Sequence, residues 1–323
     1  MGKLPSIVIV TPALADNNNG NWRTAWRWRR FLAPLYPTRL VKTWPDAHAA
    51  GDKAMIALHA RRSADAIAAW HARHGGARLA VVLTGTDLYR DIDTDPAARR
   101  SLELAGRLVV LQELGAQRLP EAVRHKARTI FQSASARKTL DKPATRLRAV
   151  AVGHLREEKS PDTLFEAARL LRDRPDIFLD HIGDAIDPAL ARQAEETMAA
   201  CPNYRWLGGR PHGEARRRIQ RAHLLIHPSR MEGGAHVVLE AVVSGMPVLA
   251  SHIDGNIGML GADYAGYFPW NNAAALAALL AVCRDDSTYL ERLRRQAAAR
   301  AALFAPATEC AAVRRLAADL LDA

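Results

Sequence analysis

The sequence predicts an α/β protein with two parallel β-sheets, each covered by helices on both faces. Short apolar runs recur along the chain, and most are separated by segments with helical periodicity, which is the pattern of repeated strand–helix–strand units. The length of 323 residues is sufficient for two sheets with separate cores. The predicted strands are Ile7–Val10, Met55–Leu58, Leu79–Leu83, Leu108–Leu111, Ala149–Val152, Phe178–Ile182, Leu224–His227 and Val248–Ala250.

The segment Ser133–Thr145 is predicted to link the two sheets. It contains Pro143 and has neither strand nor helix periodicity. We therefore expect a first domain over residues 1–143 and a second domain over residues 144–305. A final helix is predicted to begin near Pro306.

Composition and charge indicate which kinds of partner and which cellular compartment to expect. The net charge of +11 favours anionic partners, although a solvated basic surface explains it equally well. No nucleic-acid-binding module is visible, so we expect no nucleic-acid partner. No apolar run approaches the roughly 18 residues of a membrane-spanning helix, and Ile7–Val10, between Pro5 and Pro12, is too short for a signal-peptide core. The three scattered cysteines suit a reducing compartment, and we expect a cytoplasmic enzyme.

The first predicted helix, Arg23–Leu35, follows an asparagine-rich loop at residues 15–21. The residues that share its expected core-facing side are Ala25, Trp28, Leu32 and Leu35. Arg27 and Arg30 fall elsewhere and are expected to be solvated, whereas Arg23 in the first turn is placed to reach a phosphate. The mixture of tryptophan and arginine also fits a helix on a membrane surface.

Loops that follow two predicted strands of the first domain are expected to form an anion site. The loop His59–Ser63 follows one strand and Thr84–Arg90 follows the next. Open parallel sheets bind ligands at the carboxyl ends of their strands, and arginine and threonine side chains suit a small anion. The predicted residues of this crevice are Gly20, Asn21, Arg23, Arg61, Arg62, Thr84 and Thr86.

The segment Asp91–Asp95 has an Asp-x-Asp spacing that is able to bind a metal. It precedes Pro96 and a predicted helix, so a turn with a helix cap explains it better, and no metal is expected. No Gly-x-Gly-x-x-Gly sequence follows the first predicted strand, which argues against a nicotinamide-dependent enzyme.

Residues 227–251 carry the most informative motif. Glu232 and Glu240 lie eight residues apart, with Gly233 and Gly234 directly after the first and a predicted helix start between them. A helix N-terminus behind glycines favours phosphate, because free N–H groups and the helix dipole both attract an anion. A carboxylate on either side of such a site matches the layout of a nucleotide sugar, which is ribose, pyrophosphate and donor sugar.

This stretch resembles the E-x7-E donor motif of the retaining family 4 glycosyltransferases, in which Pro-Ser precedes the motif and a Gly-x-Pro-Val turn follows it. The resemblance implies the GT-B fold, in which two Rossmann-like domains face a cleft and a final helix, here 306–323, returns to the first domain. It also implies a UDP-sugar donor, no metal, Glu232 at the donor sugar and Glu240 at the ribose. The further donor-binding residues that it implies are Gly233, Gly234, Ala235 and His236.

A second motif, Val150–Lys159, resembles the family's Gly-Arg-Leu-x-x-Glu-Lys segment, whose arginine and lysine neutralise the departing pyrophosphate. Lys159 matches the lysine, and the resemblance makes it catalytic together with Glu232. His154 stands in place of the arginine, and histidine is charged only part of the time near neutral pH. Nearby arginines expected at the donor are Arg156 and Arg230, which are available to replace the missing charge, and Arg210, near the expected nucleobase position.

Over nearly the whole chain the sequence resembles a narrower group, the selenosugar synthases of selenoneine biosynthesis. That resemblance implies transfer of the sugar of a UDP-sugar, such as UDP-N-acetylglucosamine, to selenophosphate, with formation of a C–Se bond and a 1-seleno-sugar. An arginine-rich crevice without a histidine–carboxylate base suits this acceptor, because its selenium is already strongly nucleophilic. Two alternatives stay open: a family 4 enzyme that acts on a lipid or natural product, and a nucleotide-sugar-binding protein without catalysis.

Overall fold

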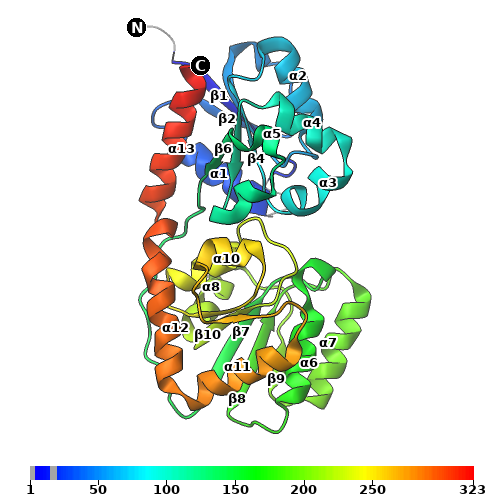
Figure 1. Cartoon of the computed structure of the whole chain (residues 1–323), viewed down its shortest axis with the longest axis vertical. Coiled ribbons are helices and arrows are strands. Elements are labelled where there is room, and N and C mark those ends of the chain that lie inside the picture. The colour runs from blue at the N-terminus through cyan, green and yellow to red at the C-terminus, as the bar shows by residue number, and fades with distance from the viewer. Residues whose placement is uncertain (1–3, 15–19) are drawn as a thin grey trace. The chain divides into compact units, whose positions relative to one another are not determined.

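The computed structural model describes residues 4–14 and 20–323, and it contains two six-stranded sheets (Figure 1). Every strand pair recorded in both sheets is parallel. The α/β architecture expected from the sequence is therefore confirmed. Of the predicted asparagine-rich loop, residues 15–19 lie outside the described residues.

The chain divides into two compact units. One comprises Met1–Gln132, Glu232–Gly234 and Pro306–Ala323, and the other comprises Ser133–Met231 and Ala235–Ala305. The segment from Ile130 to Arg146 contains neither helix nor strand. No helix in the described part of the chain is long and apolar enough to cross a membrane.

The sheet of the first unit has the order β2-β1-β3-β4-β5-β6. Its strands are β1 (Ser6–Val10), β2 (Thr38–Val41), β3 (Asp52–Leu58), β4 (Leu79–Val82), β5 (Arg107–Val110) and β6 (Ala127–Thr129). The helices of this unit are α1 (Gly20–Leu32), α2 (Ala64–His74), α3 (Ile92–Thr94), α4 (Pro96–Leu104), α5 (Glu121–Arg124) and α13 (Pro306–Leu321).

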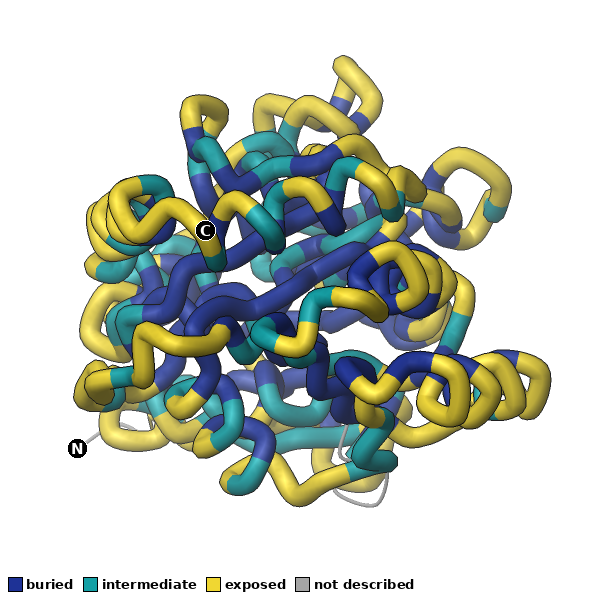
Figure 2. Tube along the Cα trace, turned by 90° about the horizontal axis from the view of Figure 1, so that it is seen from below, coloured by how far each residue is buried: buried dark blue, intermediate teal, exposed yellow. Residues whose placement is uncertain are grey.

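Alternate residues of the central strands belong to two separate cores, one on each face of this sheet. Val8 and Met55 pack in the core that contains α2 and α4 residues, such as Trp70. Ile7 and Ile56 pack in the other core, with α1 and α13 residues. Successive side chains of a strand point to opposite faces, so a strand that is apolar at every position is buried on both sides. Figure 2 shows buried strands between helices with exposed outer faces.

The sheet of the second unit has the order β12-β11-β10-β7-β8-β9. Its strands are β7 (Leu147–Val152), β8 (Ile177–Ile182), β9 (Tyr204–Trp206), β10 (Leu224–His227), β11 (Val248–Ser251) and β12 (Tyr267–Phe268). Its helices are α6 (Pro161–Leu170), α7 (Pro188–Ala200), α8 (His212–Arg221), α9 (His236–Val242), α10 (Asp254–Leu260), α11 (Ala273–Asp285) and α12 (Ser287–Arg300).

Three strands were missed by the sequence analysis, namely β2, β6 and β12. Each of them lies at an edge of its sheet. Edge strands pair on one side only and are partly solvated, so they need no continuous apolar run. All four residues of β2 are half-buried, and two of the three residues of β6 are exposed. The fourth edge strand, β9, has only three residues.

Helix α1 differs from the prediction in its end and in its basic face. It ends at Leu32, so Leu35 lies beyond the helix and is 43% exposed. Arg27, which was expected to be solvated, instead binds Glu309 of α13, with Nε donating to Oε2 at 2.6 Å and Nη2 donating to Oε1 at 2.9 Å. The indole N–H of Trp28 donates to the same carboxylate at 2.7 Å. Sequence periodicity cannot detect this partner, because it lies 282 residues away.

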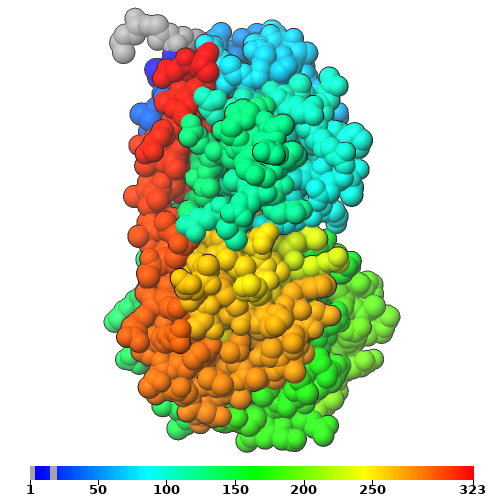
Figure 3. All heavy atoms as spheres, in the orientation of Figure 1, coloured from blue at the N-terminus to red at the C-terminus, as the bar shows by residue number. Residues whose placement is uncertain are grey.

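The Glu309 carboxylate therefore joins α13 to α1 inside the first unit. Its side chain is fully buried, whereas that of Arg27 is 18% exposed. A bidentate pair with a guanidinium is the arrangement that best compensates a buried carboxylate for lost hydration. Figure 3 shows α13, in red, lying against the blue atoms of this unit.

We expect Glu309→Ala to lower the free energy of unfolding by about 3–5 kcal/mol, because it leaves Arg27 and the Trp28 N–H without their shared acceptor. Glu309→Gln, which keeps an oxygen acceptor, should cost less. Urea unfolding followed by tryptophan fluorescence measures both. Glu291→Ala is the matched control, because its pair with Arg294 is exposed and should contribute at most about 1 kcal/mol. An equal effect of Glu309→Ala and Glu291→Ala would contradict the prediction.

Candidate functional site

The predicted donor-binding segments of the second unit meet at one edge of its sheet. Gly153 and His154 follow β7, Gly183 and Asp184 follow β8, and Arg210 lies in the segment after β9. The strands β10, β7, β8 and β9 are consecutive neighbours in the sheet. Because all are parallel, these segments share the carboxyl edge, where open α/β sheets bind ligands.

The backbone segments that follow β7, β8 and β9 lie close together and are joined by hydrogen bonds. The Gly153 N–H donates to Ile182 O at 2.8 Å, and the Gly183 N–H donates to Gly208 O at 3.0 Å. A Cβ atom on Gly183 would lie 1.9 Å from Gly153 O, so no larger residue fits there without movement of the backbone. The glycine thus allows the three strand ends to pack together beneath the site.

A small pocket lies at this edge, between the ends of β7, β8 and β10. The residues that line it are Ala151, Val152, Gly153, Lys159, Pro161, Leu164, His181, Ile226, His227, Pro228 and Ser229. The stem of Lys159 lies against Gly153, because a Cβ atom there would be 3.3 Å from Lys159 Cδ. The predicted catalytic lysine therefore stands beside a pocket at the carboxyl ends of the strands.

His154 is held as a neutral imidazole. Its Nδ1 accepts a hydrogen bond from the Asp184 N–H at 3.1 Å, so that nitrogen carries no proton while the bond persists. Burial is the main cause that lowers the pKa of His154 below its usual value, and the nearby Asp184 carboxylate only partly opposes it. His154 can donate a hydrogen bond from Nε2, but it does not replace the permanent charge of the family's arginine.

The three arginines expected near the donor each lie close to a carboxylate. Arg230 Nη1 donates to Glu157 Oε1 at 2.8 Å, and its guanidinium lies 5.4 Å from the centre of the Trp270 ring. Arg156 Nε is 3.9 Å from Glu158 Oε2, and Arg210 Nε is 3.8 Å from Glu214 Oε1. The side chains of these arginines are 41–48% exposed, so they remain accessible to an anionic ligand.

Helix α9 carries Glu240 and starts between the two glutamates, as the motif predicts. It begins at His236 and ends at Val242, and the Ala235 N–H before it donates to Met259 Sδ at 3.1 Å. The turn after it needs a glycine, because Gly245 has a φ of +73°. The turn leads into β11. Helix α9 is therefore held by the Ala235–Met259 hydrogen bond at its start and by the Gly245 turn at its end.

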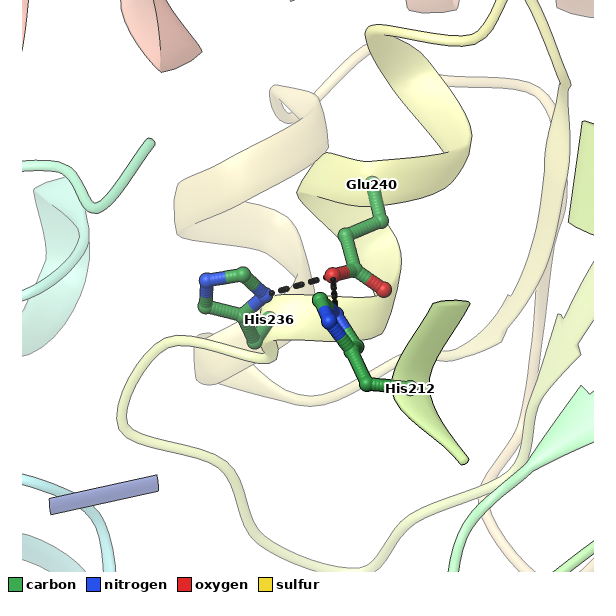
Figure 4. A group of neighbouring side chains, drawn as sticks. All are labelled: His212, His236 and Glu240. Carbon is green, nitrogen blue, oxygen red and sulfur yellow. Dashed lines mark hydrogen bonds and ion pairs between the residues drawn. The ribbon is translucent and has the colours of Figure 1, made fainter. Parts of the chain in front are cut away.

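Glu240 accepts hydrogen bonds from two histidines (Figure 4). His212 Nε2, at the start of α8, lies 2.5 Å from Glu240 Oε1, and His236 Nδ1, one turn earlier on α9, lies 3.1 Å from the same oxygen. The Glu240 side chain is 3% exposed, whereas those of His212 and His236 are 43% and 25% exposed. Arg216 Nη1 is 3.9 Å from Glu240 Oε1.

The surroundings of Glu240 keep it ionised. Burial alone raises the pKa of this carboxyl, but the hydrogen bonds from His212 and His236 outweigh burial and lower the pKa to about 2. The charged form is thus present throughout the physiological range. A buried, ionised carboxylate at a ligand-binding edge is able to accept hydrogen bonds from sugar hydroxyls.

The other predicted residues of the donor motif are divided between the units. Glu232, Gly233 and Gly234 group with the first unit, and Ala235 and His236 group with the second. Helix α9 begins four residues after Glu232, so Glu232 lies in the preceding loop and only Glu240 lies on the helix.

The predicted acceptor residues lie at the carboxyl edge of the first sheet. They follow β1, β3 and β4, which are neighbours in the order β1-β3-β4. Arg61 is engaged locally, because its Nε donates to Asp91 Oδ2 at 2.8 Å. Arg62 is exposed, and Thr86 Oγ1 lies 3.3 Å from His59 Nε2. The Thr84 N–H donates to Asp87 Oδ1 at 2.8 Å. The remaining predicted residues here, Gly20, Asn21 and Arg23, form the first turn of α1.

His59 corrects the expectation that this edge has no histidine beside a carboxylate. It is 2% exposed, with Nδ1 3.8 Å from Asp87 Oδ2 and Nε2 3.9 Å from Asp91 Oδ2. Burial is the main cause that lowers its pKa, although Asp87 opposes the shift. His59 has a φ of +74°, which is unusual for a residue other than glycine and cannot be read from sequence periodicity.

Asp91, Asp93 and Asp95 have separate partners. Asp95 caps α4 by accepting from the Ala97 and Ala98 N–H groups at 2.9 and 3.0 Å, as the cap interpretation predicted. Asp93 pairs with Arg118 at 3.0 Å. Among the residues that the structure describes, the cluster that could hold a metal ion is instead His212, His236 and Glu240. His212 lies 28 residues before Glu240 and belongs to neither sequence motif, so local spacing does not reveal it.

Comparison with known families places the second unit in a family. The profile described as "Glycosyl transferases group 1" matches residues 132–300. The "Glycosyltransferase 1 domain-containing protein 1" of Xenopus tropicalis is 30% identical over 108 residues. That alignment covers 33% of this chain and 31% of the relative, so the chain matches about a third of the relative's length.

Solved structures share the fold over almost the whole chain. Sucrose-phosphate synthase from Thermosynechococcus elongatus matches with a TM-score of 0.78 at 16% identity, over 99% of this chain and 100% of that chain. The Anabaena protein HepE, solved in complex with UDP and glucose, matches with a TM-score of 0.70 at 15% identity, over 99% of both chains. Such low identities establish the GT-B type of fold and nothing about the ligands of this chain.

We expect the double substitution His212→Ala/His236→Ala to raise the pKa of Glu240, because burial would then act with little opposition. In the wild type, the stability from ionised Glu240 is fully present above its usual pKa of 4.5 and is lost as the pH falls towards 2. In the variant a pKa above 4.5 would mean that ionisation of Glu240 no longer stabilises the fold and instead lowers stability as the pH rises. A carbon NMR titration of the carboxyl, in buffer with EDTA, measures the pKa. His252→Ala is the control, and a Glu240 pKa still near 2 in the double variant would refute the assignment.

Proposed function

The chain belongs to the group 1 glycosyltransferases, and we propose that it transfers the sugar of a UDP-sugar, such as UDP-N-acetylglucosamine, to selenophosphate. The observation that carries the donor half is the ionised, buried Glu240 at the carboxyl edge of the second sheet. The complex of HepE with UDP and glucose is a property of that protein, and it supports a UDP-sugar donor here. The acceptor half rests on the resemblance to selenosugar synthases and on the basic loops of the first unit.

Each part of the donor has a proposed partner. Glu240 accepts from the ribose hydroxyls, and the spare capacity of its carboxylate suits this, because both recorded hydrogen bonds reach Oε1. Lys159, beside the pocket, and Arg230, which is 48% exposed, bind the pyrophosphate. Glu232 binds hydroxyls of the donor sugar. His154 adds a neutral hydrogen bond, and Arg156, Arg210 and the Gly233–His236 segment complete the donor site.

The proposed reaction needs no general base. Selenium of selenophosphate attacks the anomeric carbon, the C–Se bond forms, and the bond from that carbon to the UDP oxygen breaks as UDP leaves with the electron pair. Water then hydrolyses the Se–P bond, which releases orthophosphate and the 1-seleno-sugar expected in selenoneine biosynthesis. Lys159 and Arg230 stabilise the charge that develops on the leaving pyrophosphate. Positioning of an anionic nucleophile contributes the rest.

The acceptor site is proposed at the carboxyl edge of the first sheet. Arg23 and Arg62 supply the charge that binds phosphoryl oxygens, with Gly20, Asn21, Thr84 and Thr86 around them. Arg61 contributes less, because Asp91 already holds its guanidinium. His59 is too deeply buried to touch a substrate, so its presence does not require an acceptor that must lose a proton.

A lipid acceptor is the second candidate, and the outer face of α1 favours it. Trp26 is 42% exposed and stacks on Trp22 at 5.6 Å between ring centres, while the Arg29 guanidinium lies 5.2 Å from the Trp26 ring. Aromatic rings with adjacent cations suit the surface of an anionic membrane. Flotation with vesicles that contain phosphatidylglycerol tests this candidate, and Trp26→Ala with Arg29→Ala should abolish any flotation that α1 causes.

Glu240→Ala should weaken UDP binding about tenfold or more, because a hydrogen bond to a charged group contributes about 1.5–3 kcal/mol. Calorimetric titration of UDP measures the effect. Glu166→Ala on helix α6, whose exposed side chain pairs with Arg169, is the control for fold and charge. Wild-type affinity for UDP in a folded Glu240→Ala variant removes Glu240 from the donor site.

Turnover should persist in EDTA, because protein cations neutralise the leaving group in the proposed mechanism. UDP release, measured by a coupled assay before and after EDTA treatment, tests this and also distinguishes an enzyme from a nucleotide-sugar-binding protein. Complete loss of turnover, with recovery on addition of Mg²⁺ or Mn²⁺, would show that the reaction needs a metal.

Arg23→Lys should raise the KM for selenophosphate strongly while the KM for the UDP-sugar changes little, because lysine cannot bind two phosphoryl oxygens as a guanidinium does. Arg30→Lys, on the same helix, is the matched control. The decisive assay combines enzyme, UDP-N-acetylglucosamine or UDP-glucose, and fresh selenophosphate, and detects a selenium-bearing sugar by mass spectrometry. Absence of this product, together with efficient transfer to a lipid or alcohol, would overturn the selenophosphate proposal.

A further inference from the structure

We propose that His212, His236 and Glu240 form a binding site for a divalent transition-metal ion such as Zn²⁺, and that this ion competes with the nucleotide for Glu240. The metal site follows from the geometry of the three side chains alone. The competition rests on the proposed function, which assigns the same carboxylate to the ribose. The ion would therefore inhibit the proposed reaction rather than support it.

The three side chains already converge on one point (Figure 4). Their ligand atoms all lie within 4.8 Å of one another, and both histidine nitrogens face Glu240 Oε1. In a tetrahedral zinc site with bonds of about 2.0–2.1 Å, neighbouring ligand atoms are roughly 3.4 Å apart. The two nitrogen–oxygen distances of 2.5 and 3.1 Å would have to lengthen by less than about 1 Å to admit the ion.

The elements that carry the ligands suit such a site. His236 and Glu240 lie one turn apart on α9, so both project from the same face of that helix, and His212 comes from the first residue of α8. Glu240 is almost fully buried and fixed, whereas the His212 side chain is 43% exposed and free to adjust. Two imidazoles and one carboxylate leave a fourth position for water, which is the composition of many zinc sites.

The charges around the cluster set the affinity. Glu240 supplies a carboxylate oxygen, which is a hard ligand that a dication favours. Arg216 opposes the ion, because its Nη1 lies 3.9 Å from Glu240 Oε1. Hydrogen bonds from Nη2 to Ser135 O at 2.8 Å and to Ser244 Oγ at 3.5 Å fix the Arg216 guanidinium in this position beside the cluster. Arg216→Gln should therefore strengthen metal binding, which a purely hydrogen-bonded cluster would not predict.

Occupation of the site by an ion would change what Glu240 offers to a nucleotide. An ion on Oε1 withdraws the negative charge that the ribose hydroxyls need, and its bound water fills the space beside the carboxylate. The two ligands should therefore exclude each other. Mutual exclusion is reciprocal, so the nucleotide must weaken the metal by the same factor as the metal weakens the nucleotide.

The metal site is tested by calorimetric titration of the EDTA-treated, dialysed full-length protein with ZnCl₂. One ion should bind the wild type, and His212→Ala and His236→Ala should each weaken it at least about tenfold, because even indirect partners of metal ligands contribute 10–100-fold. His252→Ala, which removes an exposed histidine outside the cluster, should leave the affinity unchanged. Thermal unfolding checks that each variant is folded. Equal Zn²⁺ binding by the wild type and both cluster variants would overturn the site.

Competition is tested with uridine as well as UDP, because uridine lacks phosphates that would chelate the ion in solution. Saturation with Zn²⁺ should weaken both ligands at least about tenfold, and EDTA should restore them. Zn²⁺ binding at the cluster with unchanged uridine affinity would overturn the competition. If the metal-free protein binds neither uridine nor UDP, the proposed donor site fails, while the Zn²⁺ titrations of the cluster variants still decide the metal site independently.

Discussion

The burial of every central strand on both faces is the constraint on which the rest of this structure depends. Strand residues such as Ile7, Val8 and Met55 are completely buried, and most side chains of the central strands are apolar. Polar side chains are therefore concentrated where strands end and the backbone turns into helices. In each unit the carboxyl ends of neighbouring strands bring sequence-distant loops to one edge, and this explains why the second unit places Lys159, His154 and Arg230 together.

The buried carboxylates of the two units differ in how accessible their hydrogen-bond partners are. Glu309 is paired with Arg27 and Trp28 inside the first unit, and Asp87 accepts from the backbone N–H groups of Ala60, Thr84 and Gly85. The partners of Glu240 differ, because the histidines that hold it are partly exposed. A ligand can therefore reach the partners of Glu240, whereas the carboxylate of Glu309 is enclosed with its partners in the core. Both proposals for Glu240, binding of sugar hydroxyls and binding of a metal ion, depend on this accessibility of its partners.

The sequence predicted the central strands well, since each is a short apolar run, and their ends mostly agree to within a few residues. It missed the edge strands β2, β6 and β12, because partial solvation removes the apolar signal. It also misassigned Arg27, since a partner 282 residues away leaves no trace in local periodicity. The motif identified Glu240 as a candidate site residue. The hydrogen bond from His212 to Glu240 could not be predicted, because it depends on how α8 packs beside α9. The left-handed backbone of His59 is likewise a tertiary property.

Net charge alone does not create an anion site, and the arginines of this chain illustrate why. Arg39, Arg61 and Arg174 each bind a carboxylate, so much of their charge is already neutralised within the fold. An anionic substrate responds to the local balance at a strand edge rather than to the total of +11. At the edge of the first sheet, Asp91 binds Arg61, whereas the neighbouring Arg62 is exposed. The local charge at a strand edge therefore depends on which carboxylates lie beside each arginine, and the total charge does not reveal this.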